Sequence, residues 1–126
     1  MSWGSDDAPP AKPPAYPDLD TFVRDWLAPT YRRNLETGGR AWCASWQEHP
    51  EAVSRLTGLW RAYEHLHEQK GTALSVFWRD HADPCMDRLL DEQGPFSKCP
   101  RGHTDRLAPL PLALTGRGAP EETRGA

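Results

Sequence analysis

Apolar positions recur with a helical period in three stretches of the chain, and this pattern predicts a small bundle of helices. The stretches cover residues 18–36, 50–69 and 72–81. In each of them apolar side chains return every three or four residues, which places them on one face of a helix. Clean alternation of apolar and polar residues, the pattern of a half-buried strand, is not found in the sequence, so we expect little or no sheet.

Prolines interrupt the pattern at two places and set the expected number of helices. Pro29 lacks a backbone N–H and crowds the preceding turn, so it kinks or ends the first helix. Asp83 followed by Pro84 is typical of a helix start, because Asp is a strong N-cap and Pro suits the first helical position. We therefore expect a short fourth helix over 84–93 that continues from the third at an angle. The predicted fold is mainly α, a bundle of three to four helices.

The stretch 50–69 is the clearest helix and is expected to be central. Its apolar stripe predicts that four large side chains are buried: Leu56, Leu59, Trp60 and Tyr63. The preceding segment 41–50, AWCASWQEHP, is aromatic and short, and a loop or a single turn suits it best.

The ends of the chain differ in composition from its middle. Residues 1–17 are rich in proline, and residues 104–126 are rich in Pro, Gly and Ala. Such segments bury too little apolar surface to offset their conformational entropy, so both are predicted to be disordered tails around a helical domain at 18–103. Within the second tail, LAPLPLAL either lies in a groove as an extended peptide or is an unstructured linker.

Charge and cysteine content narrow the class of protein. A net charge of −3 over 126 residues excludes a globally basic nucleic-acid-binding chain. The sequence shows no signal peptide and no apolar run near the ~20 residues of a membrane span. Three cysteines cannot all pair in disulfides. We therefore expect a cytoplasmic protein with reduced thiols.

Two short-gapped pairs of cysteine and histidine near the end of the domain predict a metal site. The four candidate ligands are His81, Cys85, Cys99 and His103. Structural zinc takes four Cys or His ligands, often as two close pairs joined by a spacer. One zinc ion would thus tie the third helix to the tight turn of CPRGH. The alternative is that Cys85 is a small core side chain and His81 caps a helix; Cys43 and His49 are substitutes if one of the four is not a ligand.

Two further groups of residues suggest other chemistry. Asp80, His81 and Asp83 could form a general base with an orienting carboxylate, although neighbours along a helix rarely face each other, and no catalytic residue is assigned. A basic, aromatic stretch is the candidate surface for a protein or nucleic-acid partner, because bases and peptides both bind to exposed rings. It comprises Arg32, Arg33, Arg40, Trp42 and Trp46.

Four blocks of the chain resemble a family of small actinobacterial proteins known only as a domain of unknown function. The blocks are FVRDWLAPTYRR, WCASWQEHPEAVSRLTGLWRAYE, FWRDHADPCMDRLL and GPFSKC, in this order within about residues 20–103. The resemblance implies no established activity and implies a link to mobile genetic elements. It also implies that His often stands where this chain has Cys85, an exchange that suits a metal ligand. We therefore expect a non-enzymatic accessory module; the alternative is a small metal-dependent enzyme that uses Asp80, His81 and Asp83.

Overall fold

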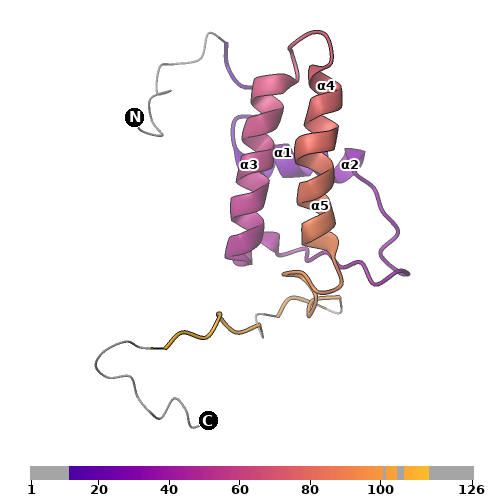
Figure 1. The fold of residues 1–126 in the computed structure, drawn as a ribbon, viewed down its shortest axis with the longest axis vertical. Helices are drawn as coiled ribbons and strands as arrows, with labels where there is room; N and C mark the ends of the chain where they lie inside the picture. Colours follow the sequence, from indigo (N-terminus) through magenta and orange to yellow (C-terminus); the bar gives the residue numbers. More distant parts are fainter. Residues whose placement is uncertain (1–11, 101, 105–106, 114–126) are drawn as a thin grey trace.

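The computed structural model describes residues 12–100, 102–104 and 107–113, and within these ranges it is helical and has no strand. The helices form three rods (Figure 1). The first rod joins α1 (Leu19–Phe22), η2 (Val23–Leu27) and α2 (Ala28–Thr30); the second is α3 (Pro50–Leu66), preceded by the 3-10 turn η3 (Trp46–Glu48); the third joins α4 (Ala73–Val76), η4 (Phe77–Ala82) and α5 (Asp83–Leu90). The prediction of a mainly α fold is confirmed.

The third rod runs straight through Pro84, so the expected fourth helix at an angle does not form. The segment η4 that leads up to this proline is π-helical, and the N–H of Asp83 donates to the carbonyl of Trp78, five residues earlier. The wider π turn relieves the contact between the proline ring and the preceding turn. Asp83 itself is in the α conformation (φ −63°, ψ −48°) and is not an N-cap. The bundle therefore has three rods in the described part of the chain.

The same local arrangement occurs in the first rod, because the sequence R-D-x-x-x-P is present twice. The two copies are residues 24–29 and 79–84. Each ends a π-helical segment, η2 or η4, at its proline, and in each the arginine Nε donates to the adjacent aspartate at 2.8 Å. A fully buried phenylalanine, Phe22 or Phe77, precedes each arginine by two residues. This repeat of sequence and structure explains why neither proline ends its helix.

Aromatic rings from the three rods form the upper core. Helix α3 and the third rod lie side by side and antiparallel, and the first rod crosses behind both (Figure 1). The ring of Trp26 is central to this contact: its centroid lies 4.8 Å from Tyr63, 5.8 Å from Phe77 and 6.0 Å from Trp78. Aromatic pairs at such separations stabilise a core beyond the area they bury.

Helix α3 is central as predicted, but it ends earlier and buries fewer large rings. Leu56 and Leu59 are buried, whereas Trp60 and Tyr63 are half-buried. The helix ends at Leu66 rather than near residue 69, and Gly71 then turns the chain with φ of +75°. Such a positive φ favours glycine, which has no Cβ to clash.

Part of the predicted N-terminal tail is attached to the body. The carboxylate of Glu64 accepts hydrogen bonds from the backbone N–H groups of Ala15 and Tyr16, at 2.8 and 2.9 Å. The indole N–H of Trp60 donates to the carbonyl of Tyr16 at 3.1 Å. The packed body therefore begins before residue 18. Residues 1–11 of this tail lie outside the described ranges.

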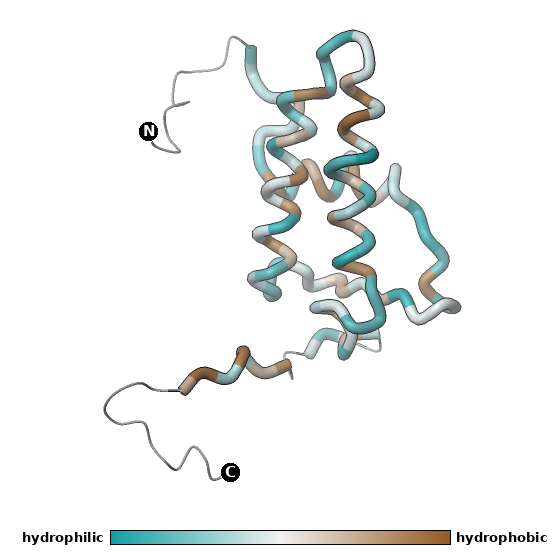
Figure 2. Tube along the Cα trace, viewed as in Figure 1, coloured by the Kyte–Doolittle hydropathy of each residue, from teal (hydrophilic) through white to brown (hydrophobic). Residues whose placement is uncertain are grey.

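The C-terminal end of the described chain leaves the body as a non-helical strand of apolar residues. Figure 2 shows this segment, 107–113, as a largely hydrophobic stretch that projects from the base. Residues 105–106 and 114–126 of the predicted tail lie outside the described ranges. None of the helices described is long and apolar enough to cross a membrane.

Candidate metal centre

The first half of the site comes from the irregular segment that leads into α3. Buried Trp46 anchors the turn η3, and the N–H of His49 donates to the Trp46 carbonyl at 3.0 Å. Pro50 follows as the first residue of α3. Because the backbone of His49 is extended (φ −109°, ψ 108°), its side chain turns back toward Cys43, which precedes the turn. Both side chains are buried.

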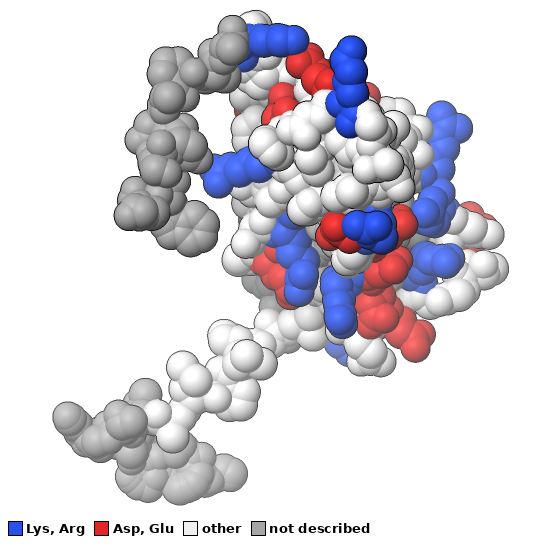
Figure 3. All heavy atoms as spheres, turned by 45° about the horizontal axis from the view of Figure 1, so that its top comes forward, with Lys and Arg blue, Asp and Glu red and all other residues white. Residues whose placement is uncertain are grey.

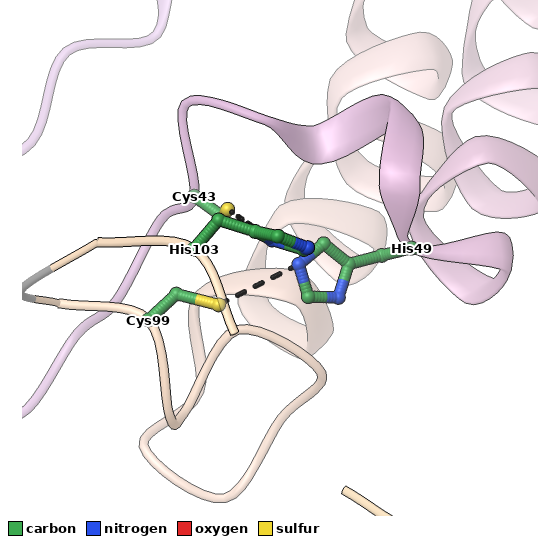
Figure 4. Close-up of side chains that lie close together, drawn as sticks. All are labelled: Cys43, His49, Cys99 and His103. Carbon is green, nitrogen blue, oxygen red and sulfur yellow. Dashed lines mark hydrogen bonds between the residues drawn. The ribbon is translucent and has the colours of Figure 1, made fainter. Parts of the chain in front are cut away.

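The second half comes from the turn after α5. Buried Phe96 fixes this segment, and the N–H of Cys99 donates to the Phe96 carbonyl at 2.9 Å. The N–H of Gly102 then donates to the carbonyl of Cys99 at 2.9 Å, with Gly102 at φ +133°. This tight turn returns the chain, so that His103 faces the thiol-bearing segment (Figure 4).

Together the two halves bring four ligand atoms to one point. The ligand atoms of Cys43, His49, Cys99 and His103 all lie within 4.8 Å of one another; we call these residues the Cys2His2 group (Figure 4). The Cys43 Sγ lies 3.3 Å from His103 Nδ1, and the Cys99 Sγ lies 3.5 Å from His49 Nε2. A tetrahedral zinc site with ordinary bond lengths has sulfur–nitrogen edges of about 3.6 Å. The group can therefore hold a metal ion with little movement.

Burial and charge in the group also suit a cation. Three of the four side chains are buried and His103 is exposed. Burial raises the pKa of the Cys43 thiol, and the neighbouring Cys99 thiol adds to this effect, while a hydrogen bond from the Ser45 backbone opposes it. A buried thiolate is thus costly without a counter-charge, and a divalent cation between two thiolates and two neutral imidazoles supplies it.

Additional contacts hold Cys99 in place. The N–H of Thr104 points to the Cys99 sulfur at 3.4 Å, and the Cys99 thiol lies 3.4 Å from the carbonyl of Thr104. The His49 ring also packs edge-on against Phe96, with centroids 4.9 Å apart. Contacts of this kind fix the orientation of ligand side chains before a metal binds.

The structure corrects two of the four ligands expected from the sequence. Cys99 and His103 are in the group, but His81 and Cys85 are not. His81 is exposed and its ring lies 6.4 Å from that of Phe77. The Cys85 thiol points to the carbonyl of Arg55 on α3, 3.6 Å away. Because the third rod continues straight through Pro84, both residues stay on the rod instead of turning toward its base.

The positions of Cys43 and His49 explain why sequence reasoning placed them second. About 50 residues separate His49 from Cys99 along the chain, so no short spacer joins the two pairs. The one available signal was the short gap in C-x5-H followed by the short gap in C-x3-H. Only the packing of η3 against the turn after α5 brings the pairs together.

The Asp80, His81 and Asp83 cluster does not assemble as a catalytic site. The Asp80 carboxylate is paired with the adjacent Arg79 at 2.8 and 3.1 Å, and this pairing lowers the pKa of Asp80. Within the described part of the chain, the Cys2His2 group is the one cluster of three or more such residues that could hold a metal, and it contains none of the three.

The predicted partner surface divides into buried and exposed parts. Trp46 is buried, so it belongs to the core and not to a binding surface. Trp42 is half-buried and meets Phe96 edge-on at 5.1 Å. The three arginines Arg32, Arg33 and Arg40 are exposed. On the face shown in Figure 3, positive and negative side chains are interspersed rather than separated.

An apolar groove lies beside this exposed part. Its volume is about 300 Å³, and its lining includes Val23, Leu27, Tyr31, Leu35, Trp42 and Met86. Arg32 and Arg33 lie at the same site. The guanidinium of Arg33 sits 3.7 Å above the centroid of the Tyr31 ring, a cation–π contact. The groove thus combines apolar walls, two aromatic rings and two positive charges.

Fold and site together define a small all-helical protein with a Cys2His2 group that ties its base together. By comparison with known families, the chain belongs to the family described as a domain of unknown function (DUF4913), over residues 16–115. Neither a curated protein nor a solved structure matched the chain. The match begins at Tyr16, the residue at which the N-terminal segment joins the aromatic core.

Proposed function

We propose that this chain is a zinc-stabilised, non-enzymatic accessory module that acts through a partner molecule. The Cys2His2 group carries the proposal, because all four of its ligands come from the protein. Four protein ligands make a closed site with a structural role, whereas catalytic zinc keeps one position open for water or substrate. Two thiolates and two imidazoles favour zinc over harder cations such as magnesium and calcium.

The partner surface of the proposal is the groove together with the exposed arginines. Its apolar walls support a protein partner, because a peptide can bury side chains there. The arginines alone would also suit a phosphate backbone, so a nucleic-acid partner is the second form of the proposal. The association with mobile genetic elements and the cytoplasmic location stay predictions from the sequence.

Elemental analysis of the purified chain tests the metal directly. We expect one zinc per chain, lost in Cys43→Ser and kept in Cys85→Ser, the matched control at the cysteine outside the group. A chain purified from zinc-containing medium without stoichiometric metal would contradict the proposal, and so would equal zinc content in the two variants.

Salt dependence distinguishes the two partner classes. Nucleic-acid binding through Arg32, Arg33 and Arg40 should weaken steeply as salt rises, because bound counterions are released from the phosphates. Binding that does not change with salt, or no binding to single- and double-stranded probes, favours the protein partner. The runner-up, a metal-dependent enzyme using Asp80, His81 and Asp83, gains no support from the Arg79-paired carboxylate of Asp80.

A further inference from the structure

The apolar tail segment, residues 107–113, is left without a packing partner in the described structure. Leu110 and Leu112 are 85% and 81% exposed, and Leu107 is 48% exposed. The segment carries no charge, contains two prolines, and stands clear of the body as an uncoloured stretch in Figure 3. Contiguous exposed apolar side chains of this kind mark a binding segment.

The groove has the properties that such a segment requires. Proline-rich chains adopt the polyproline II conformation with little loss of entropy on binding, and grooves lined by aromatic rings recognise them. Here Tyr31 and Trp42 supply the rings, and Leu35, which is 45% exposed, forms an open part of the wall. Apolar side chains of the tail segment would replace water on these surfaces.

The position of the tail segment points to a second copy of the chain. Leu107 leaves the body beside Arg88, whereas α5 contributes Met86 and Leu90 to the groove. Residue 88 lies on the opposite face of the helix from residues 86 and 90. Figure 1 likewise shows the tail leaving the base on the side away from the loop that follows α2. The tail would have to cross α5 to reach its own groove, and it meets no such obstacle in reaching another copy's.

We infer that two copies of this chain exchange their tail segments, each placing residues 107–113 in the groove of the other. This inference rests on the proposed function in that it assigns an occupant to the same groove. The exchange is reciprocal, so it forms a closed two-fold dimer and not an open chain. Two tails are bound in each dimer, and their leucines supply most of the apolar contact.

Sedimentation equilibrium of the 126-residue chain tests the exchange with four proteins. The unchanged chain should show a concentration-dependent dimer. L110E/L112E and L35E should each weaken dimerisation about 10-fold or more, because each places charge at an apolar contact. L74E is the matched control, since Leu74 is also exposed, at 53%, but lies on α4 outside the groove. It should dimerise as the unchanged chain does.

Mixing the two defective proteins gives the most specific result. L35E keeps an intact tail, and L110E/L112E keeps an intact groove, so their mixture should form a heterodimer with one exchanged tail although neither associates alone. An unchanged chain that is monomeric throughout overturns the inference, as does a dimer indifferent to both variants or a mixture that stays monomeric. Zinc content is measured in parallel, so that loss of dimer with stoichiometric zinc counts against the exchange and not against the zinc-stabilised module.

Discussion

Removal of the metal should destabilise the fold by an amount that follows from where the ligands lie in the chain. The Cys2His2 group links the segment before α3 to the turn after α5, so a bound ion closes a loop from Cys43 to Cys99. Closing a loop of roughly 57 residues restricts the unfolded chain by about 4 kcal/mol on the loop-entropy relation for cross-links. For a body of this size that corresponds to roughly 15 to 30 °C in melting temperature.

The assay is thermal unfolding by circular dichroism, with and without a chelator. The zinc-loaded chain should melt roughly 15 to 30 °C above the chelated chain. Cys43→Ser should melt near the chelated chain under both conditions. Cys85→Ser should retain the response to chelator, because the Cys85 thiol contacts the Arg55 carbonyl and no member of the group.

Two results would refute this reasoning. One is a melting temperature that chelation leaves unchanged; the other is an equal loss of the chelator response in Cys43→Ser and Cys85→Ser. Acid provides a further check on the same site. Thiolate ligands must shed their protons to bind, so zinc should dissociate as the pH falls and rebind as it rises.

Three other predictions concern the helical body. Gly58→Ala should stabilise the fold by about 0.5–1 kcal/mol, because Gly58 is helical and an added Cβ meets no atom within 4 Å, whereas Gly94→Ala should destabilise it, since its Cβ would lie 2.6 Å from a carbonyl oxygen of α5; urea unfolding that ranks the two variants the other way contradicts this. Burial raises the pKa of Cys85 to about 11, so iodoacetamide at pH 8 should alkylate it about 100-fold more slowly in the native than in the unfolded chain, and mass spectrometry after timed quenching measures this. Phe22→Ala should cost about 3–5 kcal/mol at a fully buried ring, against less than about 0.5 kcal/mol for Leu74→Ala at an exposed site, and similar costs in chemical denaturation would disprove the core assignment.

The helical pattern could be predicted from the sequence because local periodicity carries that information. The stripe of α3 identified a central helix and its buried leucines correctly. The joint at Asp83 and Pro84 was wrong, because the general preference of proline for a first helical position competed with a local π-helical solution. The repeated R-D-x-x-x-P was the available signal: the same six-residue pattern that carries the first rod through Pro29 carries the third through Pro84.

The metal ligands were half predictable for a related reason. Cys99 and His103 lie on one tight turn, so their short spacing reflects their geometry in space. His81 and Cys85 have a similar spacing, but they lie on a rigid rod whose direction is set by the aromatic core. The choice between that pair and the pair at 43 and 49 depends on which segment packs against the turn after α5, and this long-range contact leaves no periodic trace in the sequence.

A metal is most useful at the base of this particular fold. The upper core is closed by aromatic rings from three rods, where regular helices satisfy their own backbone hydrogen bonds. The base is closed by two irregular segments that bury only a few side chains, among them Trp46 and Phe96. A domain of under about 100 residues has little hydrophobic core to spare, and such domains often depend on a cross-link. Metal ligation joins these two segments where packing and backbone hydrogen bonding are weakest, so loss of the ion should open the base before it disturbs the aromatic core.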